Sequence, residues 1–157
     1  GCTVEVLTPD FQGNKPALHT VFKAGPEIFS HNVECVERIS KKVRAQAVWS
    51  RSLNVLKESV DYGLRTKTGI MLGLGETIKE VLNTMSQVID IGVEIFTIGQ
   101  YLQPTKNHLP VSTYVDEDEF KFYKQEALRM GFTVVESGAL VRSSYHADEQ
   151  ARLAKVV

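Results

Sequence analysis

The sequence has few cysteines, no long hydrophobic segment and no excess of charge of either sign. Cys2 and Cys35 are the only cysteines among 157 residues, and they lie far apart, which argues against a disulfide framework and excludes a four-thiolate metal site. The four histidines show no zinc-type spacing. The sequence therefore offers no self-contained metal site of a familiar kind.

Two further absences concern partners and location. No run of about 18 apolar residues exists, and the first residues lack a basic segment followed by an apolar one, so no membrane span or signal peptide is predicted. With 18 Lys+Arg against 19 Asp+Glu, the formal net charge is −1, which disfavours binding to nucleic acid or to an anionic membrane by bulk electrostatics. We expect a cytoplasmic protein without nucleic-acid or membrane partners.

Short β-branched runs alternate with longer stretches of helical spacing along the chain. This alternation predicts parallel strands joined by helices. The expected strands cover residues 3–7, 29–34, 67–73, 93–98 and 132–136. The expected helices cover residues 33–43, 50–62, 77–91 and 116–130, and residues 8–26 and 99–104 are expected to be loops. Thr77 and Glu80 match a capping box at the start of the third helix, and Asp116 is expected to cap the fourth. The inward faces of these two helices are expected to include Ile78 and Leu128.

The length limits the architecture. A complete eight-unit α/β barrel takes about 250 residues, so this chain supplies about four or five strand–helix units. The sequence predicts either a small open α/β sheet or part of a barrel. Both architectures place functional groups at the carboxyl ends of the parallel strands.

Two segments at predicted strand ends combine glycine or polar groups. Residues 69–77 (GIMLGLGET) join a strand to a helix N-terminus, where glycines let a ligand approach the backbone, but they match neither a Walker loop nor a dinucleotide fingerprint. Residues 30–34 (SHNVE) offer hydrogen-bond donors and acceptors to a zwitterionic ligand. The alternatives are glycines that serve only the turn, and a helix cap at Ser30 or Asn32.

The remaining candidates are less specific. Arg44 and Arg51 could each bind a carboxylate, or they could lie on a solvated helix face. Residues 100–108 form a polar segment after a strand, and residues 142–146 (RSSYH) have the composition of a surface turn. Spacing alone leaves the chemistry open.

Read together, six blocks of the sequence resemble the lipoyl synthase family. They are VEVLTPDF (Val4–Phe11), FSHNVECV (Phe29–Val36), the stretch from Arg44 to Leu53, TKTGIMLGLGE (Thr66–Glu76), TIGQYLQPTKNHLPV (Thr97–Val111) and LVRSSYHA (Leu140–Ala147). They follow in the family's order from about residue 3 to residue 148. The likeness is to the carboxyl-terminal half, or slightly more, of these radical S-adenosylmethionine (radical SAM) enzymes, so we expect a fragment.

The resemblance implies an α/β fold, a partial (β/α) barrel of the radical SAM type that is incomplete in this chain. Residues 1–138 would be the barrel part, and residues 139–157 a carboxyl-terminal segment. It also implies that the parent enzyme inserts two sulfur atoms at carbons six and eight of a protein-bound octanoyl-lysine, making the lipoyl cofactor. One four-iron four-sulfur (4Fe-4S) cluster cleaves S-adenosylmethionine to a 5′-deoxyadenosyl radical, and a second, auxiliary cluster supplies the sulfur.

The implied partners are an octanoylated lipoyl carrier domain and an electron donor. The carrier would belong to an oxoacid dehydrogenase or to the glycine cleavage protein, and the donor would be a ferredoxin or flavodoxin. The residues that match the S-adenosylmethionine pocket of the family are Asn32, Glu34, Arg44, Arg51, Gly69, Met71, Gly73 and Glu76. The RSSY element makes Ser144 the expected ligand of the auxiliary cluster, with Ser143 as the second choice, and no catalytic residue is assigned.

The main departure from the family is the lack of its cluster-binding cysteines. The family binds its two clusters with CxxxCxxC and CxxxxCxxxxxC motifs, and Cys2 and Cys35 match neither. We therefore expect the isolated chain to be inactive. The alternative is a non-catalytic module that binds the lipoyl carrier domain or a small anionic ligand.

We predict that anaerobic reconstitution of this chain with iron and sulfide yields no stable cluster, because the cysteine motifs are absent. Iron quantitation and visible absorbance measure the outcome. A stoichiometric cluster that depends on Cys2, Cys35 or Ser144 would contradict the prediction.

Overall fold

A computed structural model describes residues 3–144 and residue 152, and it contains one parallel sheet in which strand order follows chain order. The strands are β1 (Glu5–Leu7), β2 (Ile28–Ser30), β3 (Arg65–Leu72), β4 (Ile95–Gln100) and β5 (Val134–Gly138). The helices are the short 3₁₀ helix η1 (Phe11–Gly13), α1 (Lys15–Lys23), α2 (Glu37–Val43), α3 (Trp49–Asp61), α4 (Ile78–Asp90) and α5 (Glu117–Met130). Each neighbouring pair of strands is parallel, as the alternating pattern predicts.

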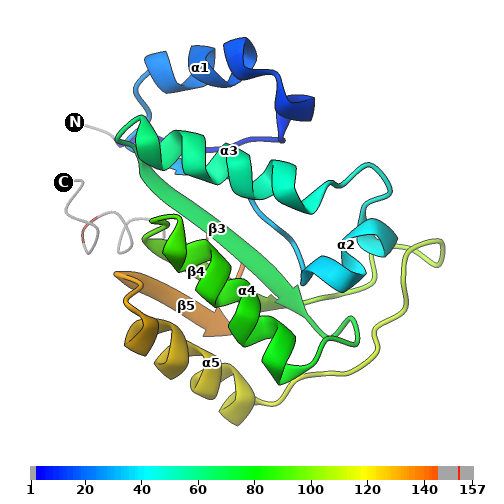
Figure 1. Ribbon diagram of the computed structural model, residues 1–157. Coiled ribbons are helices and arrows are strands. Elements are labelled where there is room, and N and C mark those ends of the chain that lie inside the picture. Colours follow the sequence, from blue (N-terminus) through cyan, green and yellow to red (C-terminus); the bar gives the residue numbers. More distant parts are fainter. Residues whose placement is uncertain (1–2, 145–151, 153–157) are drawn as a thin grey trace.

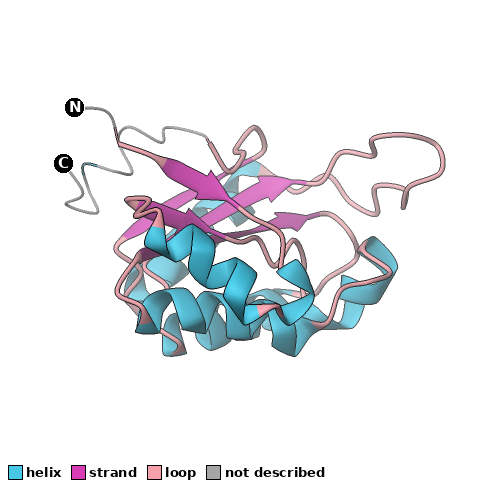
Figure 2. Cartoon of the chain, turned by 90° about the horizontal axis from the view of Figure 1, so that it is seen from above, coloured by secondary structure: helices cyan, strands magenta, loops and turns pink. Residues whose placement is uncertain are grey.

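The helices lie on one face of the sheet (Figures 1 and 2). Within the described residues no helix covers the opposite face, which we call the inner face. Successive strand–helix units that keep all helices outside are the arrangement of a barrel wall. The structure confirms the expected partial (β/α) barrel, with β1 and β5 at the two edges of the sheet.

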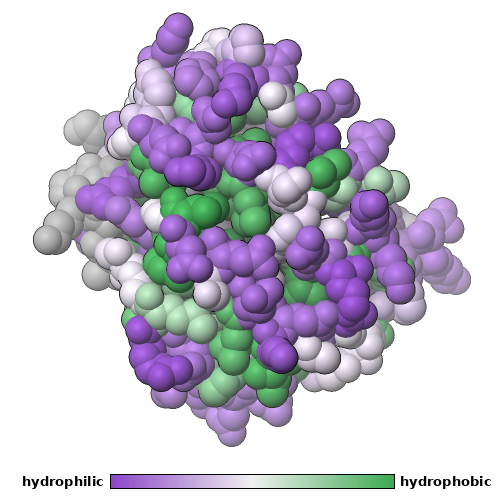
Figure 3. Space-filling model, viewed as in Figure 1, coloured by the Kyte–Doolittle hydropathy of each residue, from purple (hydrophilic) through white to green (hydrophobic). Residues whose placement is uncertain are grey.

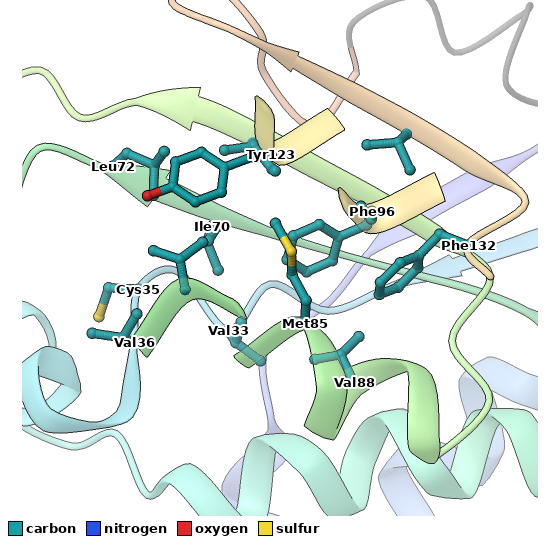
Figure 4. Packing of buried hydrophobic residues seen from close by; sticks show 14 of the residues in the cluster. Val33, Cys35, Val36, Ile70, Leu72, Met85, Val88, Phe96, Tyr123 and Phe132 are labelled. Carbon is teal, nitrogen blue, oxygen red and sulfur yellow. The ribbon is translucent and has the colours of Figure 1, made fainter. Parts of the chain in front are cut away.

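The main core fills the space between the sheet and its helices (Figure 4). Ile70 and Leu72 from β3 and Phe96 from β4 pack against Met85 and Val88 of α4, and all five are at most 3% exposed. A smaller cluster on the inner face joins Ile28, Ile95 and Val134. Both faces of the central strands are therefore buried, and this includes polar strand residues such as Thr66, Lys67 and Thr68 of β3.

The side of the molecule that carries the helices is mostly hydrophilic at its surface, and hydrophobic residues show in the seams between helices (Figure 3). Among the described residues no helix combines the length and the apolar character needed to cross a membrane.

The expected loop over residues 8–26 is wrong, because it contains α1. The Asn14 side chain accepts a hydrogen bond from the Ala17 amide at 3.1 Å, and Pro16 occupies the first turn, where it needs no amide donor. Leu18 and Phe22, one turn apart, are buried against β2 and α3. The glycines and prolines make this segment look like a loop. They lie at the start of the helix or outside it, and none interrupts it.

Several other boundaries and faces differ from the expectations. β2 ends at Ser30, so residues 31–34 follow the strand instead of belonging to it, and β4 continues through Gln100 into the expected loop. Ile78 and Leu128 are 51% and 47% exposed, not buried. Both lie at the edge of the apolar face of their helix, where a small rotation of the helix about its axis decides which side chains contact the core.

Helix α4 begins with the capping box that the sequence predicts. Thr77 accepts from the Glu80 amide at 3.3 Å, and Glu80 accepts from the Thr77 amide at 2.8 Å. Glu80 also accepts from Arg38 of α2 at 2.5 Å, and the same guanidinium reaches the Gly75 carbonyl at 2.8 Å. Hydrogen bonds from Arg38 and Thr77 lower the pKa of Glu80 to about 2. One carboxylate thus joins α2 to the start of α4.

The lowered pKa gives Glu80 a predictable effect on stability. Ionised Glu80 stabilises the folded state above its unfolded pKa, and this contribution is lost as pH falls through the folded pKa of about 2. We expect Glu80→Gln to be less stable than the wild type at neutral pH, with the difference shrinking as the pH falls below about 4.5. Urea unfolding at several pH values measures this, with the exposed Glu37→Gln as control. A difference that is independent of pH would contradict it.

Candidate functional site

The segment after β2 is held against β3 by backbone hydrogen bonds. The Glu34 amide donates to the Gly69 carbonyl at 3.1 Å, and the Met71 amide donates to the Glu34 carbonyl at 2.8 Å, forming a parallel bridge between Glu34 and Ile70. Glu34 has φ 72°, a left-handed conformation that is costly for a residue with a side chain. This strained position, at the carboxyl end of the sheet, marks a candidate functional residue.

The electrostatics of this segment favour a polar ligand. Burial raises the pKa of Glu34, although Arg44 and a hydrogen bond with Asn32 oppose the shift. The Arg44 guanidinium lies 3.4 Å from the Asn32 carbonyl and 3.5 Å from the Val33 carbonyl. The side-chain oxygen of Asn32 is buried and has no hydrogen-bond partner in the described structure. An orphaned acceptor beside a buried carboxylate and a cation suits a ligand with both donors and a negative group.

Two pockets adjoin at Glu34 and Met71, which line both. The smaller, of about 150 Å³, lies on the inner face and is lined by Asn32, Glu34, Gly69, Ile70, Met71, Thr97, Gly99, Val141, Arg142 and Ser143. The larger, of about 520 Å³, is lined by Glu34, Lys42, Val43, Arg44, Met71, Tyr101, Leu102, Pro104, Asn107, His108, Leu109 and Pro110. The structure therefore brings together five of the residues predicted for the S-adenosylmethionine pocket, namely Asn32, Glu34, Arg44, Gly69 and Met71, and Ser143 lines the smaller pocket with them.

Gly73 and Glu76 shape the turn after β3. The Glu76 carboxylate accepts from the Gly73 amide at 2.5 Å and from the Leu74 amide at 2.9 Å. Gly73 has φ 98°, and a Cβ there would lie 2.3 Å from the Gln100 side-chain nitrogen and 2.4 Å from the Thr113 carbonyl. Position 73 therefore requires glycine because the Gln100 side chain and the Thr113 backbone lie so close to it, and no ligand is needed to explain it.

Gln100 is a site-shaping residue that the sequence does not single out as buried. Its amide nitrogen lies 3.0–3.1 Å from the carbonyl oxygens of Leu72, Tyr101 and Thr113, and its oxygen accepts from the Val115 amide at 2.9 Å. Gln100 is only 4% exposed. It fixes the loop that walls the larger pocket, and the only sequence signal for it is an amide side chain at a strand end.

Arg51 lies apart from this group. Its guanidinium pairs with Asp10 at 2.6 Å and donates to the Gln46 carbonyl at 2.8 Å. Burial raises the pKa of Asp10, but hydrogen bonds from Gln12 and Arg51 more than offset this and lower it. His31, 1% exposed, lies near this ion pair and bonds Thr8 and Ser52. In the structure Arg51 links the segments that contain Asp10 and Gln46. Its place in the cofactor pocket stays a prediction.

The described residues do not provide a cluster site. They contain no group of three or more His, Cys, Asp or Glu side chains able to hold a metal ion. Cys35 is buried in the core on the helix side (Figure 4), where burial raises the pKa of its thiol to about 12. Ser144 is exposed and Ser143 half-buried, whereas Cys2 and Tyr145 lie outside the described residues. A protonated, buried thiol does not suit an iron–sulfur cluster.

The fold is shared with a solved structure of low sequence identity. A domain of pyruvate-formate lyase-activating enzyme from Bacteroides vulgatus superposes with a TM-score of 0.65 at 12% identity, covering 88% of this chain and 83% of that one. This likeness shows that the chain has the architecture of an α/β half-barrel domain.

Sequence comparison defines the family. The profile of the Radical SAM superfamily matches residues 1–88, and the chain belongs to that superfamily. Lipoyl synthase of Rubrobacter xylanophilus is 53% identical over 99% of this chain and 49% of that protein, and lipoyl synthase of Bacteroides fragilis is 51% identical over 96% and 52%. The chain spans about half the length of these relatives, and the resemblance that the six blocks indicate is confirmed.

The two glycines of the turn after β3 make a matched test of its packing. Gly75→Ala meets only Ser112 at 3.4 Å, and its cost of about 1 kcal/mol comes from its positive φ of 93°. Gly73→Ala must also displace the Thr113 carbonyl, so we expect it to lose about 2 kcal/mol more. Urea denaturation measures both variants. Equal losses would show that the loop from Gln100 to Thr113 yields freely.

Proposed function

We propose that this chain supplies about half of a lipoyl synthase, which inserts two sulfur atoms into a protein-bound octanoyl-lysine. The observation that carries the proposal is similarity of about 50% identity, along almost the whole chain, to proteins of that name. The grouping of Asn32, Glu34 and Arg44 in the two adjoining pockets supports it, because these side chains are predicted from the family to bind S-adenosylmethionine.

The donor and acceptor chemistry of the pocket fits S-adenosylmethionine. The orphaned Asn32 oxygen and the Glu34 carboxylate would accept from its ammonium group, and Arg44 would pair with its carboxylate. Gly69 and Met71 would line the adenine side, while Gly73 and Glu76 keep the turn after β3 in place. When bound, this cofactor supplies the hydrogen-abstracting radical of the superfamily.

The 4Fe-4S clusters of the parent enzyme require ligands beyond the described residues. We propose Ser144, or Ser143 in its place, as this chain's contribution to the auxiliary cluster. The substrate of the whole enzyme would be an octanoylated lipoyl carrier domain, and its electrons would come from a ferredoxin or flavodoxin. The division into residues 1–138 and 139–157 stays a prediction, since most of the second segment lies outside the described residues.

A chimera tests the proposed function. The amino-terminal half of the Rubrobacter xylanophilus relative, with its cysteine motifs, would be joined to this chain and expressed in bacteria lacking lipoyl synthase. We expect lipoylation of carrier proteins, measured by mass spectrometry. Glu34→Gln should lower it about tenfold or more, because the negative charge that strengthens the hydrogen bond to the cofactor's ammonium group is lost. Glu37→Gln, on the exposed start of α2, is the matched control.

A folded chimera that takes up iron and S-adenosylmethionine but makes no lipoyl group would contradict this function. The alternative is a non-catalytic module. It predicts that the chain alone binds an octanoylated carrier domain or a small anion such as phosphate, which titration calorimetry measures.

A further inference from the structure

The chain turns back over the inner face after β5. The Val141 amide donates to the Gly138 carbonyl at 3.0 Å, and Val141 is only 6% exposed. Val141, Arg142 and Ser143 all line the inner-face pocket. We call residues 139–144 the strap, because they run from the end of one edge strand across the inside of the sheet.

The first attachment of the strap is at Gly99 of β4. A Cβ at Gly99 would lie 2.4 Å from the Val141 carbonyl oxygen, so the strap occupies the space that any side chain would fill. Gly138, the neighbour of Gly99 in the β4–β5 register, differs, because a Cβ there would meet the Val141 side chain at an ordinary 3.6 Å. Gly99 is therefore the glycine that the strap requires.

The second attachment is at Lys67 of β3. Lys67 is completely buried, pairs with Glu5 of β1 at 2.9 Å and donates a hydrogen bond to the Ser143 carbonyl oxygen. A buried ammonium group is stable only when it is paired and its hydrogen bonds are satisfied. The Ser143 carbonyl is one of these acceptors, so Lys67 and the strap depend on each other.

We propose that Lys67 and Gly99 are positioning residues that hold the strap on the inner face and thereby set where Ser143 and Ser144 lie. Gly99 supplies the space and Lys67 supplies the hydrogen bond. The strap itself does not depend on the proposed function. Only the purpose of the positioning, to present a serine to the auxiliary cluster, rests on it.

The glycine pair tests the strap in the chain alone. Trypsin cleaves after Arg142, and its rate there reports how often the strap opens when reclosing is fast. We expect Gly99→Ala to speed this cleavage about tenfold or more, and Gly138→Ala to leave it within about twofold of the wild type. Equal rates for Gly99→Ala and the wild type would overturn the attachment at Gly99.

The lysine test is independent. We expect Lys67→Met, which matches the unbranched stem of lysine but lacks the ammonium group and its hydrogen bonds, to speed cleavage after Arg142 as well. Lys124→Met is the matched control, because Lys124 also pairs with a strand glutamate, Glu136, at 3.5 Å but is 42% exposed. If Lys67→Met fails to fold by circular dichroism, the glycine pair still decides the proposal.

The chimera allows a further measurement, the Mössbauer spectrum of the auxiliary cluster, which would not change if Gly99 only stabilised the fold. With folding and iron at the amino-terminal cluster retained, Gly99→Ala should alter the Mössbauer spectrum of the auxiliary cluster, while Gly138→Ala should not. An unchanged spectrum would overturn the positioning role. A folded wild-type chimera that takes up iron and S-adenosylmethionine but makes no lipoyl group would refute the proposed function, and the proteolysis result would stand separately.

Discussion

The bridge between Glu34 and β3 is the contact on which the candidate site depends. β2 has only three residues, and its ladder with β3 ends at Ser30. Two further backbone hydrogen bonds, at Glu34, return the chain to β3 after a short detour. That detour places Asn32 and the Arg44 contact beside the pocket, and the left-handed Glu34 is the cost of making it. Strain of this kind persists where the surrounding structure holds it in place.

A second set of contacts keeps the wall of the site rigid. Glu76 closes the turn after β3, and Gln100 joins that turn to the loop that follows β4. Both use side chains to satisfy backbone groups that the end of a sheet would otherwise leave unpaired. The polar residues near the site therefore divide into those that complete the fold and those, such as Asn32, with hydrogen-bonding capacity left over.

The sequence predicts what depends on local pattern. Alternating strands and helices, the Thr77 capping box and the Asp116 cap follow from spacing, and the structure confirms them. α1 escapes prediction because its apolar face is short, so the glycines and prolines around it give the stronger sequence signal. The cluster at residues 30–34 is recognisable from its polarity, but the Glu34 bridge depends on β3, which lies more than thirty residues further along the chain. Lys67 escapes prediction for a related reason, since a lysine within a strand suggests an exposed position until its distant partners are known.

The order of the strands has a consequence for how the molecule is assembled. Every strand pairs with its sequence neighbours, so each unit can dock on the one made before it as the chain leaves the ribosome. The Lys67 contacts differ, because they join Glu5 of β1 to Ser143, which follows β5. Both contacts can be present only after all five strands and residue 143 have been synthesised, so they link β1, β3 and the segment after β5 once the sheet is complete.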